Sequence, residues 1–389
     1  MKAALVYATF APFHVARLER TARIGRNNGD TVMGVEIASV QSDYSWQRSE
    51  LRDLAVTLFP GTEYWTLPRR SIRKSINVLL DEIAPDVVVL PGWAFSESIG
   101  GLAWCLKRRR AAVVLSDSQP IDHPPNMAKS CLRRMLVREF DAAFVGGSPH
   151  VRYLVELGMP RESCFVGCDV VDNDRFGRDT RESGTQPDRD RPAVLFSALR
   201  LLPRKNVEGA LEEFARATGS WQWIIAGDGP SKEQITRSVL DLGLSERVRM
   251  VGNVSYDDLP AWYRKADVYL QPSKSEPWGL AVNEAMAAGL PVIVSTQCGC
   301  HEDLVEDGRN GFAFDASTPG ALEAALNKAW ESRHKWAAMG AESKRIIAAW
   351  DLDRFGNGFW AACRAAQSRS KSRTRLITPL VARMLSTAV

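Results

Sequence analysis

Short, continuous apolar runs alternate with helix-forming segments along the first half of the chain. Strands that are buried on both faces of a parallel sheet have this continuous apolar character. The predicted strands are 3–8, 31–37, 86–90, 112–116, 142–145 and 164–167. The predicted helices are 16–26, 96–110, 127–140 and 149–157. This alternation indicates a doubly wound α/β domain, in which the loops 9–14, 91–96 and 117–123 follow strands and line a ligand cleft.

The second half repeats the alternation after a change in composition at residues 172–192, which are charged and nearly devoid of large aliphatic side chains. The predicted strands are 193–197, 223–226, 249–252, 268–271 and 292–295. The predicted helices are 207–217, 231–242, 257–264 and 319–332. We therefore predict an N-terminal domain (1–171), a linker (172–192), a second Rossmann-like domain (193–350), and a C-terminal helix with a basic tail (351–389) that crosses back to the first domain.

Composition adds little to this architecture but excludes several classes of protein. The 389 residues suffice for two cores, and 45% hydrophobic and 25% charged residues are ordinary globular values. A net charge of +4 is too small to indicate nucleic-acid binding by itself. Seven cysteines without paired CxxC sets favour a reducing compartment. Met1 leads directly into a strand-like run, and no window is long and apolar enough to span a membrane, so we expect a cytoplasmic protein without a signal peptide.

The stretch 276–295, EPWGLAVNEAMAAGLPVIVS, predicts a loop, a helix, a turn and a strand. Proline and glycine break the chain before the helix formers LAVNEAMAA, and a second glycine and proline end that helix before the β-branched run. The helix start, at Gly279 and Leu280, then lies at the carboxyl end of the preceding strand. Free N–H groups and the positive end of the helix dipole favour an anion there, and a phosphate fits.

Two carboxylates frame this helix start, Glu276 in the loop before it and Glu284 roughly 8 Å further along the helix axis. A carboxylate accepts hydrogen bonds and suits pairs of hydroxyl groups, such as a ribose diol or a sugar ring. The alternative is a solvated pair on a surface helix, but Glu284 stands in an apolar segment, where burial without a partner would be costly. The spacing therefore favours a sugar nucleotide.

The segment from Glu276 to Glu284 resembles the Glu-x7-Glu motif of retaining glycosyltransferases of family four. The resemblance extends over most of the second half. Its other segments are 200–205, 224–230, 247–254, 266–279 and 308–315, in the order and spacing of that family. It implies the GT-B architecture, in which two doubly wound Rossmann-like domains face each other across a cleft.

The resemblance also assigns roles to residues of the second half. Glu284 is expected to hold the ribose, Arg200 and Lys205 the diphosphate, and Glu276 the donor sugar. A basic linker face is the alternative for the two cations, and Arg204 between them has no support from the resemblance. A base contact by Asn253 and a cleft-lining turn at Gly227 are further expectations. The remaining glycines of such turns, Gly229 and Gly252, shape the backbone, and Glu302 either supports the sugar end or is an ordinary acid at a helix start.

The first half departs from the family. Its first strand-to-helix loop, TFAPFHVARL, lacks the usual glycine pair, and the usual histidine after a middle strand is missing from VVLSDSQPIDH. Asp117 is our candidate to take the place of that histidine as a catalytic residue. His14 and His123 are also candidates, although a lone histidine is more often structural.

Metal sites have weak support in the sequence. Asp172-Asn173-Asp174 has the form of an acidic pair that holds Mn²⁺ in another class of glycosyltransferases, but it lies beside the charged linker. Cys298, Cys300 and His301 lack a fourth ligand nearby. We therefore expect no metal and no cofactor apart from the donor substrate.

These expectations combine into a retaining hexosyltransferase that uses a nucleoside diphosphate sugar and a glycan, lipid-linked or small-molecule acceptor. The alternatives are a sugar-nucleotide epimerase or phosphorylase of the same architecture, or a non-catalytic sugar-nucleotide sensor. No nucleic acid partner is expected. The basic residues after Asp353 and the apolar end LITPLVARML predict peripheral binding to an anionic membrane, for which a solvated tail is the alternative.

Overall fold

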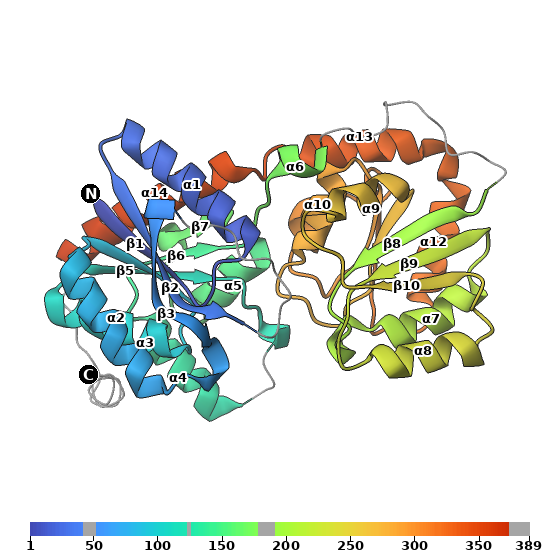
Figure 1. Cartoon of the computed structure of the whole chain (residues 1–389). Coiled ribbons are helices and arrows are strands. Elements are labelled where there is room, and N and C mark those ends of the chain that lie inside the picture. The colour runs from blue at the N-terminus through green and yellow to red at the C-terminus, as the bar shows by residue number, and fades with distance from the viewer. Residues whose placement is uncertain (42–51, 123–125, 178–190, 373–389) are drawn as a thin grey trace. The chain divides into compact units, whose positions relative to one another are not determined.

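The computed structural model describes residues 1–41, 52–122, 126–177 and 191–372. The chain forms two compact units, of which unit 1 is Met1–Val170 with Leu352–Val389 and unit 2 is Val171–Asp351. Each unit has its own parallel sheet, of seven strands in unit 1 and six in unit 2 (Figure 1). The predicted α/β fold class of two doubly wound sheets is confirmed.

The sheet of unit 1 has the order β3-β2-β1-β4-β5-β6-β7, and every pairing in it is parallel. Its strands are β1 (Lys2–Tyr7), β2 (Thr31–Val40), β3 (Ala55–Glu63), β4 (Val87–Pro91), β5 (Ala111–Ser116), β6 (Ala142–Val145) and β7 (Cys164–Val166). The sequence pattern does not predict β3, because its proline and glycine (AVTLFPGTE) interrupt the apolar run and its position at the sheet edge leaves none of its residues fully buried.

Helices cover both faces of this sheet. They are α1 (Pro12–Asn27), α2 (Arg69–Ile83), α3 (Ser96–Arg108), α4 (Met127–Val137), α5 (Ser148–Glu156) and α14 (Leu352–Ser372). Short 3₁₀ turns lie at Arg52–Leu54, Tyr64–Thr66, Pro120–Asp122 and Arg161–Ser163. The last helix, α14, lies against the first, α1 (Figure 1), where the Trp360 indole donates to the Thr21 carbonyl at 3.0 Å. Residue 25 must be glycine-sized here, since a Cβ would lie 2.5 Å from the Trp360 ring.

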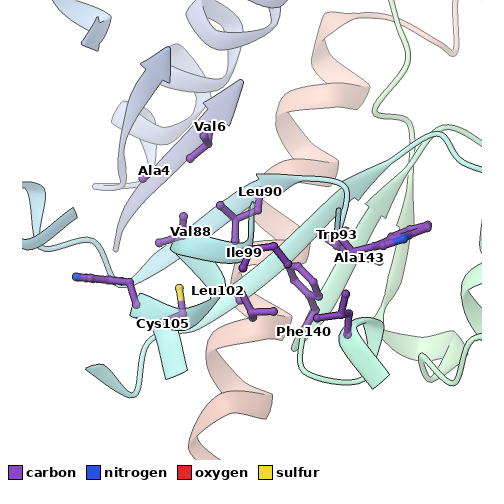
Figure 2. Packing of buried hydrophobic residues seen from close by; sticks show 14 of the residues in the cluster. Ala4, Val6, Val88, Leu90, Trp93, Ile99, Leu102, Cys105, Phe140 and Ala143 are labelled. Atoms are coloured by element: carbon purple, nitrogen blue, oxygen red, sulfur yellow. The ribbon is translucent and has the colours of Figure 1, made fainter. Parts of the chain in front are cut away.

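The core of unit 1 fills the space between its sheet and helices. Figure 2 shows Val88 and Leu90 of β4 beside Ile99 and Leu102 of α3, all of them buried. The approach of α3 to β4 is close because residue 101 is glycine: a Cβ there would lie 2.6 Å from Leu90. Continuous apolar runs are thus explained by helices on both faces.

A charged side chain is also buried in unit 1. Arg17 is 2% exposed and donates through Nε and Nη2 to the carbonyl of Val170, at 3.0 and 2.8 Å. Its guanidinium lies 3.5 Å from Asp169 and over the rings of Phe13 and Phe355, at 4.9 and 5.5 Å. Arg17 therefore holds the chain at the end of the first segment of unit 1 and near the start of the second.

The sheet of unit 2 has the order β10-β9-β8-β11-β12-β13, again with parallel pairings. Its strands are β8 (Ala193–Ala198), β9 (Trp221–Ala226), β10 (Val248–Gly252), β11 (Val268–Gln271), β12 (Val292–Ser295) and β13 (Gly311–Phe314). Its helices are α6 (Asn173–Gly177), α7 (Val207–Arg216), α8 (Lys232–Asp241), α9 (Leu259–Lys265), α10 (Leu280–Ala287), α11 (His301–Leu304), α12 (Ala321–Glu331) and α13 (Trp336–Ile347), with 3₁₀ turns at Pro203–Lys205 and Arg333–Lys335. Among the residues that the structure describes, no helix has the length and apolarity that crossing a membrane requires.

Candidate functional site

The predicted loop, helix and strand around residues 276–295 are present as the loop after β11, helix α10 and strand β12. Gly279 begins α10 in the left-handed region, at φ 105°. Because all strands of unit 2 run in parallel, the loops after β8, β9, β10 and β11 meet at the same edge of the sheet as the start of α10. The predicted donor-binding residues of this unit lie in these loops or at this helix, whereas Glu302 lies in α11, after β12.

Glu276 forms a buried ion pair with Lys205. The Nζ atom of Lys205 contacts Oε2 of Glu276, and each residue is 8% exposed. The same oxygen accepts from Gln271 Nε2 at 3.2 Å and from Ser273 Oγ at 3.4 Å. Sequence analysis placed Lys205 and Glu276 on different parts of a donor, whereas the structure brings them into direct contact.

A backbone bond and a side-chain bond hold the loop after β8 against the loop after β11. Lys274 N donates to the Arg204 carbonyl at 2.8 Å, and Asn206 Nδ2 donates to the Pro272 carbonyl at 3.2 Å. Arg204 donates to the Ser275 carbonyl at 2.9 Å and approaches Glu276 Oε1 to 3.9 Å. Arg204, to which the resemblance gave no role, is thus a second cation beside Glu276.

Arg200 is half-buried in the same loop, two residues after the end of β8. This loop lies close to the loop after β9. A Cβ at Gly227, where φ is 136°, would meet the Leu199 carbonyl oxygen at 1.8 Å. Gly227 therefore has a packing role that accounts for its place in the turn.

The turn after β12 supports Glu276 from the other side. Glu276 N donates to the Gln297 carbonyl at 3.3 Å, and Gly299 N donates to the Glu276 carbonyl at 2.9 Å. Cys298 in this turn is buried, which raises its pKa well above that of an ordinary thiol. A small-residue turn, as expected from TQCGC, thus holds the backbone of Glu276 in place.

Glu284 lies in the second turn of α10 and is 7% exposed. Burial raises its pKa to about 7, although the hydrogen bond from Tyr263 and the positive charge of Arg175 act in the opposite direction. The Tyr263 hydroxyl, from α9, donates to Oε2 at 2.7 Å. A diol that donated hydrogen bonds to this carboxylate would favour its charged form.

Tyr263 and Arg175 are neighbours of Glu284 that the sequence did not single out. Arg175 lies on α6, in the segment predicted as a linker, and 178–190 of that segment lie outside the described residues. Its guanidinium stacks on Tyr256 at 4.6 Å and pairs with Asp257. Phe176, next to it, is fully buried and contacts Tyr263 edge-on at 5.7 Å. The aromatic residues of the segment YDDLPAWYR were the feature of the sequence that could have indicated these neighbours of Glu284.

The remaining candidates have different surroundings. Gly279 is buried, Leu280 is half-buried, and Asn253 is exposed at the end of β10. Asn173, in the Asp-Asn-Asp triplet whose form only weakly suggested a metal site, donates to the carbonyls of Ile347 and Trp350 at 2.9 and 3.3 Å. Within the described parts of the chain, no group of three or more His, Cys, Asp or Glu side chains could hold a metal ion.

Two candidates belong to unit 1. Asp117 is exposed and follows directly after β5. His14 stacks on Tyr7 with ring centres 3.9 Å apart, and its Nδ1 accepts from the Ala11 backbone at 3.2 Å. Desolvation, aided by the charge of Arg17, lowers the pKa of His14 well below its ordinary value, so this side chain is a neutral cap of α1. The third candidate, His123, lies outside the described residues.

Residues 179–346 match a family model described as glycosyl transferases group 1. The chain is 31% identical over 199 residues to a GDP-mannose-dependent alpha-(1-6)-phosphatidylinositol monomannoside mannosyltransferase of Mycolicibacterium smegmatis, covering 48% of this chain and 50% of that protein. It is 33% identical over 221 residues to D-inositol 3-phosphate glycosyltransferase 2 of Catenulispora acidiphila, covering 52% and 49%. The chain thus spans about half the length of these curated relatives.

Solved structures resemble the chain over nearly its full length. Anabaena Alr3699/HepE in complex with UDP superposes with a TM-score of 0.71 at 17% identity, covering 93% of this chain and 99% of that one. Sucrose-phosphate synthase from Thermosynechococcus elongatus gives a TM-score of 0.73 at 16% identity, covering 94% and 98%. These likenesses confirm the predicted GT-B fold.

The raised pKa of Glu284 predicts how stability depends on pH. Between its ordinary pKa of 4.5 and about 7, the folded state binds a proton that the unfolded state releases. Stability therefore falls as pH rises through this window, by on the order of 3 kcal/mol from this residue. Urea denaturation should show that the free energy of unfolding falls less between pH 4.5 and pH 8 in Glu284→Gln than in the wild type. Glu331→Gln, on the surface of α12, is the control, and an equal loss in all three proteins would contradict the assignment.

Proposed function

We propose, from the match of residues 179–346 to group 1 glycosyl transferases and from the GT-B fold, that this chain is a retaining hexosyltransferase. It moves a hexose-type sugar from a nucleoside diphosphate sugar to a hydroxyl group of a glycan, lipid-linked or small-molecule acceptor. The observation that carries the proposal is the pair of buried carboxylates on either side of the start of α10, each with its own hydrogen-bond donors.

The two carboxylates suit different parts of a donor. Glu284, whose pKa of about 7 leaves both charge states accessible, accepts the hydroxyls of a ribose. Glu276 accepts hydroxyls of the sugar, while Lys205 and Arg204 lie beside it as sources of positive charge. The backbone N–H groups at the start of α10 lie between the two acids in the sequence and suit a phosphate.

The proposed mechanism uses positive charge to stabilise the leaving group. As the bond between the sugar and the diphosphate breaks, negative charge grows on the phosphate, and Lys205, Arg204 and Arg200 can offset it. The acceptor hydroxyl attacks from the face that the diphosphate leaves, and the departing phosphate takes up its proton. No protein nucleophile and no metal ion is part of this proposal, and Asp117 remains a candidate for orienting the sugar.

The names of similar proteins support the substrate classes. The mannosyltransferase of Mycolicibacterium smegmatis is named for GDP-mannose and a phosphatidylinositol monomannoside, and Alr3699/HepE has been crystallised with UDP-glucose. Other relatives are named as lipopolysaccharide core glycosyltransferases. We therefore propose a UDP- or GDP-linked hexose as the donor and a lipid or glycan as the acceptor class.

The reaction can be followed by NMR with a panel of UDP- and GDP-hexoses and mixed glycan and glycolipid acceptors. We expect transfer, with the anomeric configuration of the donor kept in the product and with no loss of activity in EDTA. An inverted product, or activity lost in EDTA and restored by Mn²⁺, would contradict the mechanism. Donor binding without turnover would instead favour a sugar-nucleotide sensor.

Substitution of the two glutamates should affect donor binding and turnover differently. Glu284→Gln should weaken binding of the donor and of the free nucleoside diphosphate alike, by roughly tenfold to a hundredfold, because both ligands contain the ribose. Glu276→Gln should spare nucleoside diphosphate affinity and lower kcat by roughly a hundredfold. Calorimetric titration and initial rates measure both quantities, with Glu331→Gln as the control. The reverse pattern would exchange the two roles.

The C-terminal tail is proposed to contact anionic membranes. In unit 1, Arg364 pairs with Asp30 at 3.1 Å and Arg369 donates to Ser163 at 2.6 Å, so these two cations are already engaged. The proposal rests on the basic residues of 373–389, which lie outside the described residues and would contribute about 1 kcal/mol each near an anionic leaflet.

Deleting residues 373–389 should therefore weaken co-sedimentation with vesicles of phosphatidylglycerol at low salt. Activity on a soluble acceptor should be retained, because the deletion starts after the end of α14. If the wild type does not co-sediment with the vesicles, or if the deletion variant co-sediments equally well, the proposed membrane contact of the tail is wrong.

A further inference from the structure

Strand β11 carries a row of buried polar side chains toward Glu276. Tyr269 and Gln271 are two residues apart and therefore point to the same face of the strand. Tyr269 and Ser273 are fully buried, and Gln271 is 1% exposed. A buried strand of a doubly wound sheet is otherwise expected to be apolar, so the polar groups need an explanation.

These side chains form one continuous hydrogen-bonded chain. The Tyr269 hydroxyl donates to Gln271 Oε1 at 2.6 Å. Gln271 Nε2 donates to Ser273 Oγ at 2.9 Å and to Glu276 Oε2 at 3.2 Å. We call the chain from Tyr269 through Gln271 to Glu276 the relay.

The partners determine which way the amide of Gln271 points. If the amide were reversed, its oxygen would lie against the Glu276 carboxylate, and two acceptors would face each other. In this orientation one amide group accepts from the Tyr269 hydroxyl and donates to Glu276 at the same time. A glutamate at this place would set two carboxylates side by side, and a leucine would leave both partners without the bond.

The far end of the relay is held by packing. The ring of Tyr269 packs against Tyr263 and Phe196, with ring centres 5.9 and 6.4 Å away. Its hydroxyl also lies 3.5 Å from the carbonyl of Ala198, the last residue of β8. Burial raises the pKa of Tyr269 well above its ordinary value, so the hydroxyl keeps its proton at any working pH.

We infer that Gln271 is a positioning residue, which fixes the orientation of the Glu276 carboxylate for the sugar of the donor. The inference rests on the proposed function. Lys205 contacts Oε2 through a long, flexible side chain and Ser273 donates to it at 3.4 Å, whereas the amide of Gln271 adds a shorter, directed bond from the end of β11 at 3.2 Å. Turnover is sensitive to such placement, and a shift of about 1 Å at a catalytic group can lower a rate about a hundredfold.

The competing explanation is that the relay serves stability alone. Gln271→Leu removes the bond to Glu276 but also takes away the nearer acceptor of the buried Tyr269 hydroxyl, which keeps only the Ala198 carbonyl at 3.5 Å. The double variant Tyr269→Phe/Gln271→Leu removes both polar partners, and such paired replacements can restore stability. Stability and positioning are thereby separated.

The experiment compares Gln271→Leu, the double variant and a control, Gln222→Leu, which lies near the amino end of β9 at the opposite edge of the sheet. Gln271→Leu should lower kcat by roughly tenfold to a hundredfold with unchanged affinity for UDP or GDP. The double variant should regain much of the lost Tm but not the lost kcat. Wild-type kcat in Gln271→Leu, or recovery of kcat together with Tm, would overturn the inference.

A spectroscopic readout tests the relay without any turnover. In protein labelled with ¹⁵N-glutamine, the side-chain amide signal of Gln271 is assigned by its loss in Gln271→Leu. Glu276→Gln should shift that signal, whereas Glu331→Gln should leave it in place. An unchanged signal in Glu276→Gln would refute the relay. Absence of turnover in the wild type together with a shifted signal would refute the proposed function and keep the relay.

Discussion

The buried ion pair of Lys205 and Glu276 governs how the loops of unit 2 are arranged. Two charges removed from water are tolerated only when their geometry and their other hydrogen bonds are good. The pair joins residues 71 positions apart, so the loops after β8 and β11 must lie together. Asn206 adopts the left-handed conformation at φ 55° beside this contact and bonds to Pro272. The backbone of both loops thus follows from the need to satisfy two charges.

Glu284 is a buried carboxylate of the same unit that forms no ion pair with any residue the structure describes. Its hydrogen bond comes from the neutral hydroxyl of Tyr263, and burial prevails, raising its pKa to about 7. Two glutamates eight positions apart therefore differ in chemistry because their surroundings differ. One is held by an ion pair and an amide, and the pKa of the other is raised by burial.

The sequence predicted the strands of both sheets except β3 and β13, because continuous apolar runs are a direct consequence of burial on both faces. It did not predict β3, which has an internal proline and glycine. It also did not predict β13, whose first residue is Gly311; a Cβ atom at this position would lie 1.8 Å from the Val292 carbonyl oxygen. The spacing in the sequence singled out Glu276 and Glu284 as candidates. Arg204, Gln271 and Tyr263 were not, since their contacts join segments that only folding brings together.

The position of α14 has a consequence for synthesis of the chain. Unit 1 is discontinuous: its α1 is covered by Trp360, and Arg17 lies over the ring of Phe355. These residues leave the ribosome after all of unit 2, which is one continuous segment. Domains generally fold as units during synthesis. The unit that is translated second can therefore complete its core first, while the nascent first unit waits with one face of its sheet partly uncovered.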